Sequence, residues 1–284
     1  MANPLELAFF VSFGMKLNKH KPIGVFDSGL GGLTVAKAIN LLLPNEKLIY
    51  FGDTIHLPYG DKSKETIIQY SMRIAEFLLK QHCKVIVIAC NSASANAFEA
   101  VLKKVGDVAL VLNVIDPVVD YIVNTKYTKI GVIGTKSTID SNTYVEKILA
   151  RKKGIVVSSM ATPLLVPMIE EGFIFDDISN AIVRNYLSRQ EISGIDSLIL
   201  GCTHYPIIRN QINRFFNFEV DIVDSGKIVA NSLRELLTEN NLLNDSNTLA
   251  KNKFYISDYT PYFKLIARMF FEEEIELVKL NFWN

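Results

Sequence analysis

From Pro22 onward, short apolar runs alternate with longer segments in which apolar residues recur at helical spacing. The clearest helical pattern spans about residues 64–80, where Ile68, Met72 and Ala75 fall on one face. Strands that alternate with helices are typical of a parallel or mostly parallel sheet with both faces covered. Ten runs are too many for one small sheet, so the pattern predicts an α/β protein with two α/β domains. The strands are expected at Ile23–Phe26, Lys47–Phe51, Val85–Ala89, Ala109–Ile115, Ile130–Ile133, Ile155–Ser159, Ser197–Leu200, Val220–Val223, Lys253–Ile256 and Ile275–Leu280.

Two short similarities link distant parts of the chain. Residues 25–29 (VFDSG) resemble residues 222–226 (IVDSG), and residues 87–91 (VIACN) resemble residues 198–203 (LILGCT). Such similarities would suit two similar halves that face one another. The stretch Glu239–Lys253 holds five Asn and few apolar residues, so we expect an exposed loop there.

Composition narrows the class of protein. The 284 residues are 49% hydrophobic and 21% charged, which suits a packed core and excludes a disordered chain. Thirty Lys and Arg balance thirty Asp and Glu, so there is no electrostatic case for nucleic acid or an anionic membrane surface. The sequence contains no run of about 18 apolar residues, so it predicts no membrane-spanning helix. The odd, small number of three Cys argues against a disulfide framework and favours the reducing cytoplasm.

The first residues do not fit the pattern of the rest. Leu5–Phe13 is mostly apolar, but Glu6 interrupts it, and neither a preceding Lys or Arg nor a small-residue cleavage site completes a secretory signal. We expect residues 1–14 to be an added start outside the fold. The alternative is a native extension that packs on a partner.

The glycine-rich stretch Asp27–Gly32, after the first strand, invites comparison with nucleotide-binding loops. Counted from Gly29, the third glycine of a G-x-G-x-x-G fingerprint is replaced by Thr34, and residues 134–137 lack the Gly-Lys pair of a phosphate loop. What remains is a set of backbone N–H groups at a helix start, which suits a carboxylate as well as a phosphate. The alternative is a tight turn in which Asp27 or Ser28 caps a helix.

Two of the three cysteines lie where an α/β sheet binds its ligands, beyond the carboxyl ends of strands. Cys90 and Cys202 each follow a buried run and precede polar residues, and a helix start there would favour the thiolate. Cys83, before the third strand, is expected to be an inert core residue. His204 could adjust the protonation of Cys202, whereas Cys202-x-His204 lacks the usual spacing of zinc ligands.

Four motifs, in this order and spacing, resemble those of the glutamate racemase family: IGVFDSG at 23–29, PYG at 58–60, ACNSA at 89–93 and GCTHYP at 201–206. The resemblance runs from about Pro22 to Phe282. It implies a cytoplasmic, cofactor-independent and metal-independent enzyme that interconverts L- and D-glutamate and supplies D-glutamate for bacterial peptidoglycan. It also implies a possible homodimer.

The resemblance further implies two similar α/β domains with the active site in the cleft between them. Residues 21–116 and 225–284 would form the first domain, residues 117–224 the second, and residues 1–20 an extension outside the fold. The chain would cross between the domains near Ile115–Pro117 and Val223–Gly226.

By the same resemblance, Cys90 and Cys202 are the two catalytic acid–base residues. Asp27 and His204 would assist the thiols, with Glu170 a further candidate, although from the sequence alone Glu170 is expected to end a helix on a solvated face. The residues expected to bind substrate are Asp27, Ser28, Tyr59, Gly60, Asn91, Ser92, Thr203 and His204. The chain departs from the family pattern at Ser92, where Thr is usual, and at residues 55–57, where the departure concerns only surface packing.

Two alternatives remain at this stage. The first is a racemase of the same fold for aspartate or another amino acid, which differs in substrate only. The second is a thiol redox or binding protein in which Cys90 and Cys202 form a switch, although no C-x-x-C motif supports it.

Overall fold

The computed structural model describes residues 17–246 and 248–283 and contains two parallel sheets. The larger sheet has the strand order β10-β9-β2-β1-β3-β4, and the smaller sheet has the order β6-β5-β7-β8. The strands of the larger sheet are β1 (Ile23–Asp27), β2 (Leu48–Gly52), β3 (Val85–Ile88), β4 (Leu110–Asn113), β9 (Lys253–Ile256) and β10 (Leu277–Lys279). Those of the smaller sheet are β5 (Lys129–Gly134), β6 (Val156–Ala161), β7 (Ser197–Gly201) and β8 (Asp221–Val223). Every strand pair is parallel.

Helices connect the strands throughout. The α-helices are α1 (Leu33–Leu42), α2 (Lys64–Lys80), α3 (Asn91–Val105), α4 (Ile115–Val123), α5 (Lys136–Asp140), α6 (Thr143–Arg151), α7 (Leu165–Glu170), α8 (Asp177–Leu187), α9 (Arg209–Phe215), α10 (Ser225–Glu239) and α11 (Pro261–Phe271). Three short 3₁₀ turns are η1 (Tyr59–Asp61), η2 (Gln190–Ile192) and η3 (Tyr205–Ile208).

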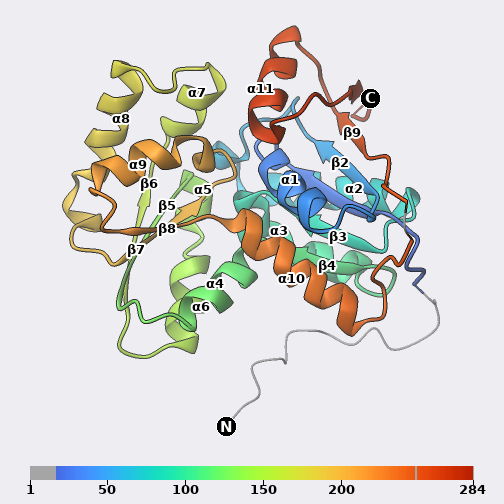
Figure 1. Ribbon diagram of the computed structural model, residues 1–284, viewed down its shortest axis with the longest axis horizontal. Helices are drawn as coiled ribbons and strands as arrows, with labels where there is room; N and C mark the ends of the chain where they lie inside the picture. Colours follow the sequence, from blue (N-terminus) through green and yellow to red (C-terminus); the bar gives the residue numbers. More distant parts are fainter. Residues whose placement is uncertain (1–16, 247, 284) are drawn as a thin grey trace.

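Each sheet forms a lobe, which we call the first lobe for the larger sheet and the second lobe for the smaller one (Figure 1). The second lobe is built from the middle of the chain. After β8 the chain returns along α10, which packs against α1 of the first lobe and α4 of the second. The fold class predicted from the sequence, α/β with two mostly parallel sheets, is therefore confirmed.

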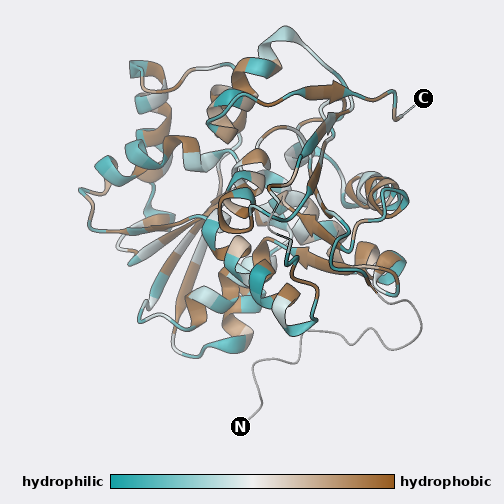
Figure 2. Ribbon diagram, turned by 45° about the vertical axis from the view of Figure 1, so that its right-hand side comes forward, coloured by the Kyte–Doolittle hydropathy of each residue, from teal (hydrophilic) through white to brown (hydrophobic). Residues whose placement is uncertain are grey.

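The strands are buried on both faces, because alternate side chains enter different cores. In β1, Ile23 and Val25 pack with α1, α10 and α11, whereas Phe26 packs with α2 and α3. The first of these cores continues into the second lobe, where it includes Ile133 and Leu200. Figure 2 shows the strands as apolar bands inside more polar helices. The two lobes thus share one continuous apolar core.

All ten predicted strands form, and the helix predicted at 64–80 has those bounds. One predicted strand end needs correction. The run at 109–115 ends as a strand at Asn113, because the Asn113 side chain accepts bonds from the N–H groups of Ile115 and Asp116 and so starts α4. The loop expected to be exposed at 239–253 is mostly exposed in its described residues. The exception is Leu242, which is 3% exposed and whose carbonyl accepts a bond from Lys84.

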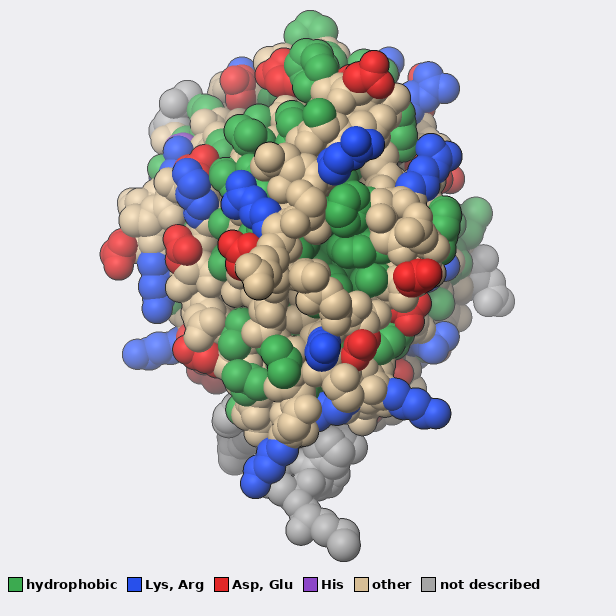
Figure 3. Space-filling model, turned by 90° about the vertical axis from the view of Figure 1, so that its left-hand side faces the viewer, with side chains coloured by type: hydrophobic (Ala, Val, Ile, Leu, Met, Phe, Trp, Pro, Cys, Tyr) green, Lys and Arg blue, Asp and Glu red, His purple; other side chains and the backbone are tan. Residues whose placement is uncertain are grey.

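The predicted added start, residues 1–14, lies outside the described residues. Of the predicted extension 1–20, the described part contacts the fold: Leu17 packs against the core, and the Lys19 carbonyl accepts a bond from Lys84. In the part of the chain that the structure describes, no helix is both long and apolar enough to cross a membrane. On the face drawn in Figure 3, basic and acidic side chains are interspersed around a central group of apolar side chains.

Candidate active site

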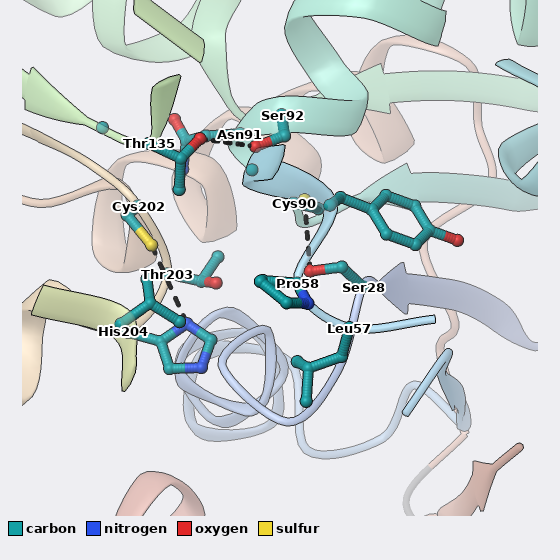
Figure 4. A pocket seen from close by; sticks show the side chains of 14 residues that line it. Ser28, Leu57, Pro58, Cys90, Asn91, Ser92, Thr135, Cys202, Thr203 and His204 are labelled. Carbon is teal, nitrogen blue, oxygen red and sulfur yellow. Dashed lines mark hydrogen bonds between the residues drawn. The ribbon is translucent and has the colours of Figure 1, made fainter. Parts of the chain in front are cut away.

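A buried cavity of about 20 Å³ lies between the lobes, beyond the carboxyl ends of β1, β3 and β7 (Figure 4). It is lined by nine of the residues predicted from the sequence: Ser28, Tyr59, Gly60, Cys90, Asn91, Ser92, Cys202, Thr203 and His204. Five lining residues were not among the predicted site residues: Leu57, Pro58, Thr135, Val166 and Gly201. The expectation that the departure at residues 55–57 concerns only surface packing is therefore wrong for Leu57. The predicted residues Asp27 and Glu170 lie behind the lining and act on it through other side chains.

Cys90 enters the cavity from the first lobe, on the side opposite Cys202 in Figure 4. It is the N-cap of α3, so the helix start predicted for it is present: its Sγ accepts a bond from the N–H of Ala93 at 3.5 Å. Its thiol donates to the Ser28 hydroxyl at 3.6 Å. Burial, together with the negative charge of Asp27, raises the pKa of Cys90 to about 12. These surroundings favour the protonated thiol of Cys90 over its thiolate.

Cys202 enters from the second lobe, directly after β7. The chain continues into the short turn η3 rather than an α-helix, so the prediction of a stabilising helix start does not hold for this thiol. Its partner is instead an imidazole, because His204 Nδ1 lies 3.7 Å from Cys202 Sγ. The two thiols thus have unlike surroundings.

His204 links Cys202 to Glu170 at the end of α7. Its Nε2 lies 2.8 Å from Glu170 Oε1, and its ring, 3% exposed, meets the edge of Phe270. Burial alone would lower the pKa of His204, but its hydrogen bonds with Cys202 and Glu170 raise it well above its ordinary value of 6.5. The expectation that Glu170 lies on a solvated face is wrong, since its carboxylate holds this imidazole.

Asp27 is fully buried and joins the lobes. One carboxylate oxygen accepts from the N–H of Gly29 at 2.9 Å, and the other accepts from the Thr203 hydroxyl of the second lobe at 3.3 Å. Burial raises the pKa of Asp27, and His204 and the nearby N–H groups oppose that rise. Neither Asp27 nor Ser28 caps α1, whose N-cap is Gly32 without a side-chain bond, so the alternative of a simple helix cap is wrong.

Asn91 carries a donor without a partner. Its Oδ1 accepts from the Tyr144 hydroxyl at 2.8 Å, which fixes the amide with its Nδ2 free. The residue is 2% exposed and lines the cavity, yet Nδ2 bonds to nothing among the described residues. A buried donor left unpaired is costly. This amide therefore calls for an acceptor inside the cavity.

The hydroxyl of Ser92 bridges the two lobes. It lies 2.8 Å from Thr135 Oγ1 and 3.2 Å from Thr138 Oγ1, at the start of α5. Thr135 was missed because the segment 134–137 was tested only as a phosphate loop, although its place after β5 was the available signal. Gly60 packs on it so closely that a Cβ there would lie 2.5 Å from Thr135 Cβ. Tyr59 differs, since its hydroxyl donates to Asp53 at 2.7 Å, away from the site.

Comparison with known proteins shows the family to which the chain belongs. The model of the family described as Asp/Glu/Hydantoin racemase matches residues 23–233. The chain belongs to this racemase family. It is 42% identical over 266 residues to the glutamate racemase of Chlorobaculum parvum, covering 93% of this chain and 97% of that protein. It is 40% identical over 269 residues to that of Neisseria meningitidis serogroup C, covering 93% and 99%.

A solved structure supports the same assignment for the racemase. The glutamate racemase of Francisella tularensis, crystallised with D-glutamate, superposes with a TM-score of 0.87 at 39% identity, covering 93% of this chain and 99% of that one. The chain is thus an isomerase with the two-domain racemase fold.

The third cysteine, Cys83, lies in the first-lobe core, away from the cavity, where burial raises the pKa of its thiol to about 12. No cluster of three His, Cys, Asp or Glu side chains in residues 17–246 and 248–283 could hold a metal ion.

Proposed function

We propose that this racemase interconverts L- and D-glutamate by a two-base reaction in which Cys90 and Cys202 exchange protons with the α-carbon. The observation that carries the proposal is that two thiols from different lobes line one buried cavity from opposite sides (Figure 4). The relatives named above are glutamate racemases, which supports glutamate rather than aspartate as the substrate.

Two bases are needed because racemisation removes a proton from one face of the α-carbon and returns one to the other. With L-glutamate, the Cys202 thiolate takes the α-proton, and the electron pair of the C–H bond stays on carbon as a carbanion. The Cys90 thiol then gives its proton to the opposite face, which yields D-glutamate, a Cys90 thiolate and a Cys202 thiol. With D-glutamate the two residues exchange roles.

The surroundings of the thiols suit these roles. The raised pKa of Cys90 favours its thiol, which the L-to-D direction needs for the second proton transfer. On the other side, the His204 imidazole, held by Glu170, can balance the negative charge when Cys202 carries it. The thiolate that forms at Cys90 is met by the N–H of Ala93 and the Ser28 hydroxyl.

The carbanion must be stabilised by the site itself, because the α-proton of an amino acid is a weak acid. The free amide N–H of Asn91 and the hydroxyls of Ser28, Ser92 and Thr203 are donors that can bind the substrate carboxylates. In a small cavity between the lobes these donors act more strongly than they would in bulk water. We propose that no cofactor or metal takes part.

The cavity must also open. A volume of about 20 Å³ holds roughly one water molecule, far less than a glutamate. We propose that the lobes separate to admit substrate and close around it, dividing as the domains 21–116 with 225–284 and 117–224. D-Glutamate made in the cytoplasm in this way would supply peptidoglycan synthesis.

The proposal is tested by incubating the purified protein with L-glutamate, and separately with L-aspartate, without added pyridoxal phosphate or metal. Chiral chromatography should detect D-glutamate, formed far faster than D-aspartate. Racemisation of aspartate alone would refute the substrate assignment. Loss of glutamate racemisation in a chelator, restored by metal, would refute the proposed chemistry.

A further inference from the structure

A second polar cluster lies behind the active-site loop, which we define as residues 53–61. Its centre is Asp53, a fully buried carboxylate with four hydrogen-bonding partners. One oxygen accepts from the Tyr59 hydroxyl at 2.7 Å and lies 2.9 Å from His56 Nδ1. The other accepts from the Ser257 hydroxyl at 2.9 Å and from the indole N–H of Trp283 at 2.7 Å. A bond to a buried carboxylate is stronger than one between neutral groups.

Trp283 comes from the C-terminal segment that follows β10 and is the only tryptophan of the chain. Its ring meets the edges of His56 and Tyr70 at centroid distances of 4.5 and 5.1 Å. The Arg73 guanidinium lies 4.8 Å from the ring and donates to the carbonyl of Phe282 at 2.8 Å. The indole is therefore held on several sides, so its N–H points steadily at Asp53.

The loop that this cluster holds forms one wall of the cavity. Leu57, Pro58, Tyr59 and Gly60 all line it. Leu57 also packs beside Gly29, where an added Cβ would meet Leu57 Cδ1 at 2.4 Å, next to the Ser28 that bonds to Cys90. A shift of the loop would therefore change both the wall of the cavity and the setting of one thiol.

We propose that Trp283 is a positioning residue for substrate binding, which acts by fixing the active-site loop through Asp53. The effect on KM rests on the proposed function, whereas the fixing of the loop does not depend on it. The C-terminal segment then contributes to the affinity for glutamate without contacting the substrate, although it is far from the cavity lining in sequence. Losing the indole N–H leaves the proton-transfer groups in place, so the substrate KM should change more than kcat.

The test is Trp283→Phe, which removes the N–H and keeps an aromatic ring, with Phe282→Leu as the matched control. Phe282 packs on Phe51, Phe77 and Trp283 but does not bond to Asp53. We expect Trp283→Phe to raise KM for D-glutamate about tenfold, as loss of one bond to a charged group implies, with kcat changed less than about threefold. Phe282→Leu should lower the melting temperature and leave KM near that of the wild type.

Amide hydrogen exchange of residues 53–61 gives a second readout that does not depend on activity. Exchange in these residues should be faster in Trp283→Phe than in the wild type and in Phe282→Leu. Unchanged exchange, or faster exchange with an unchanged KM, would overturn the positioning role. A wild-type protein inactive toward glutamate would refute the proposed function, and the exchange comparison would still decide whether Trp283 fixes the loop.

Discussion

Cys90 and Cys202 differ in the groups that can offset a negative charge on sulfur. Cys90 has a helix N–H and a hydroxyl, opposed by the nearby carboxylate of Asp27, which disfavours a thiolate. Cys202 has an imidazole backed by Glu170. Because the raised pKa of Cys90 favours its thiol, the two directions of reaction begin from different proton arrangements.

Ser92→Ala should weaken catalysis, because the hydroxyl both lines the cavity and bonds to Thr135 across the lobes. We expect a loss of about 1–3 kcal/mol of transition-state stabilisation, which is about one to two orders of magnitude in kcat/KM. Steady-state kinetics in both directions would measure it. Ser94→Ala is the control, since this buried serine of the same helix bonds to the Ile88 carbonyl. Equal effects of the two variants would argue against a role for Ser92 in the site.

Glu170→Gln should change how stability depends on pH. The folded protein holds His204 with a raised pKa, so the stabilisation is fully present below 6.5 and is lost as pH rises through the raised value. The wild type should therefore melt higher than the variant by a margin that is largest below about pH 6.5 and shrinks as the pH rises above that value. Melting temperatures measured at several pH values test this prediction. The control is Glu171→Gln, since Glu171 is the next residue and is exposed. A margin that grows with pH would contradict the assignment.

At the scale of elements, the loop between β1 and α1 approaches the second lobe closely enough to exclude side chains. A Cβ on Gly31 would lie 2.4 Å from His204 Nδ1 and 2.6 Å from Thr203 Oγ1. Glycine at this position lets the lobes close on the Cys202 side of the cavity. On the other side of the cavity, Gly60 packs equally closely against Thr135.

Gly31→Ala should therefore cost activity more than stability. The methyl group must displace His204 or part the lobes, and overpacking of this kind costs about 1–3 kcal/mol. We expect kcat/KM to fall at least about tenfold. Gly226→Ala is the control, because a Cβ there meets its nearest neighbour at an ordinary 3.4 Å. A fully active Gly31→Ala would show that the lobes need not close this tightly.

The strands and helices were predictable from the sequence because the local pattern of apolar and polar residues decides them. Alternating apolar runs gave all ten strands, and the rule that ligands bind at strand ends brought Cys90 and Cys202 forward as candidates. Contacts between lobes were not predictable in this way. Glu170 entered only through the family resemblance, and Thr135 and Trp283 were not proposed, because each acts on a partner far away in sequence.

At the scale of the whole molecule, the shared core links the stability of the lobes. Ile23 and Val25 of the first lobe belong to the same apolar cluster as Ile133 and Leu200 of the second. We expect urea to unfold both lobes in one transition. The fluorescence of Trp283, which reports the first lobe, should then change together with far-UV circular dichroism, which reports both. Separate midpoints would show that the lobes unfold independently.

The central claim is that two thiols exchange protons with opposite faces of one α-carbon. It is tested most directly by incubating Cys90→Ala and Cys202→Ala in heavy water with each glutamate enantiomer and following α-deuterium by NMR. Neither variant should racemise. Cys90→Ala, which keeps Cys202, should exchange only L-glutamate, and Cys202→Ala should exchange only D-glutamate. Near wild-type racemisation by Cys90→Ala, or equal exchange of both enantiomers by both variants, would contradict the two-base mechanism.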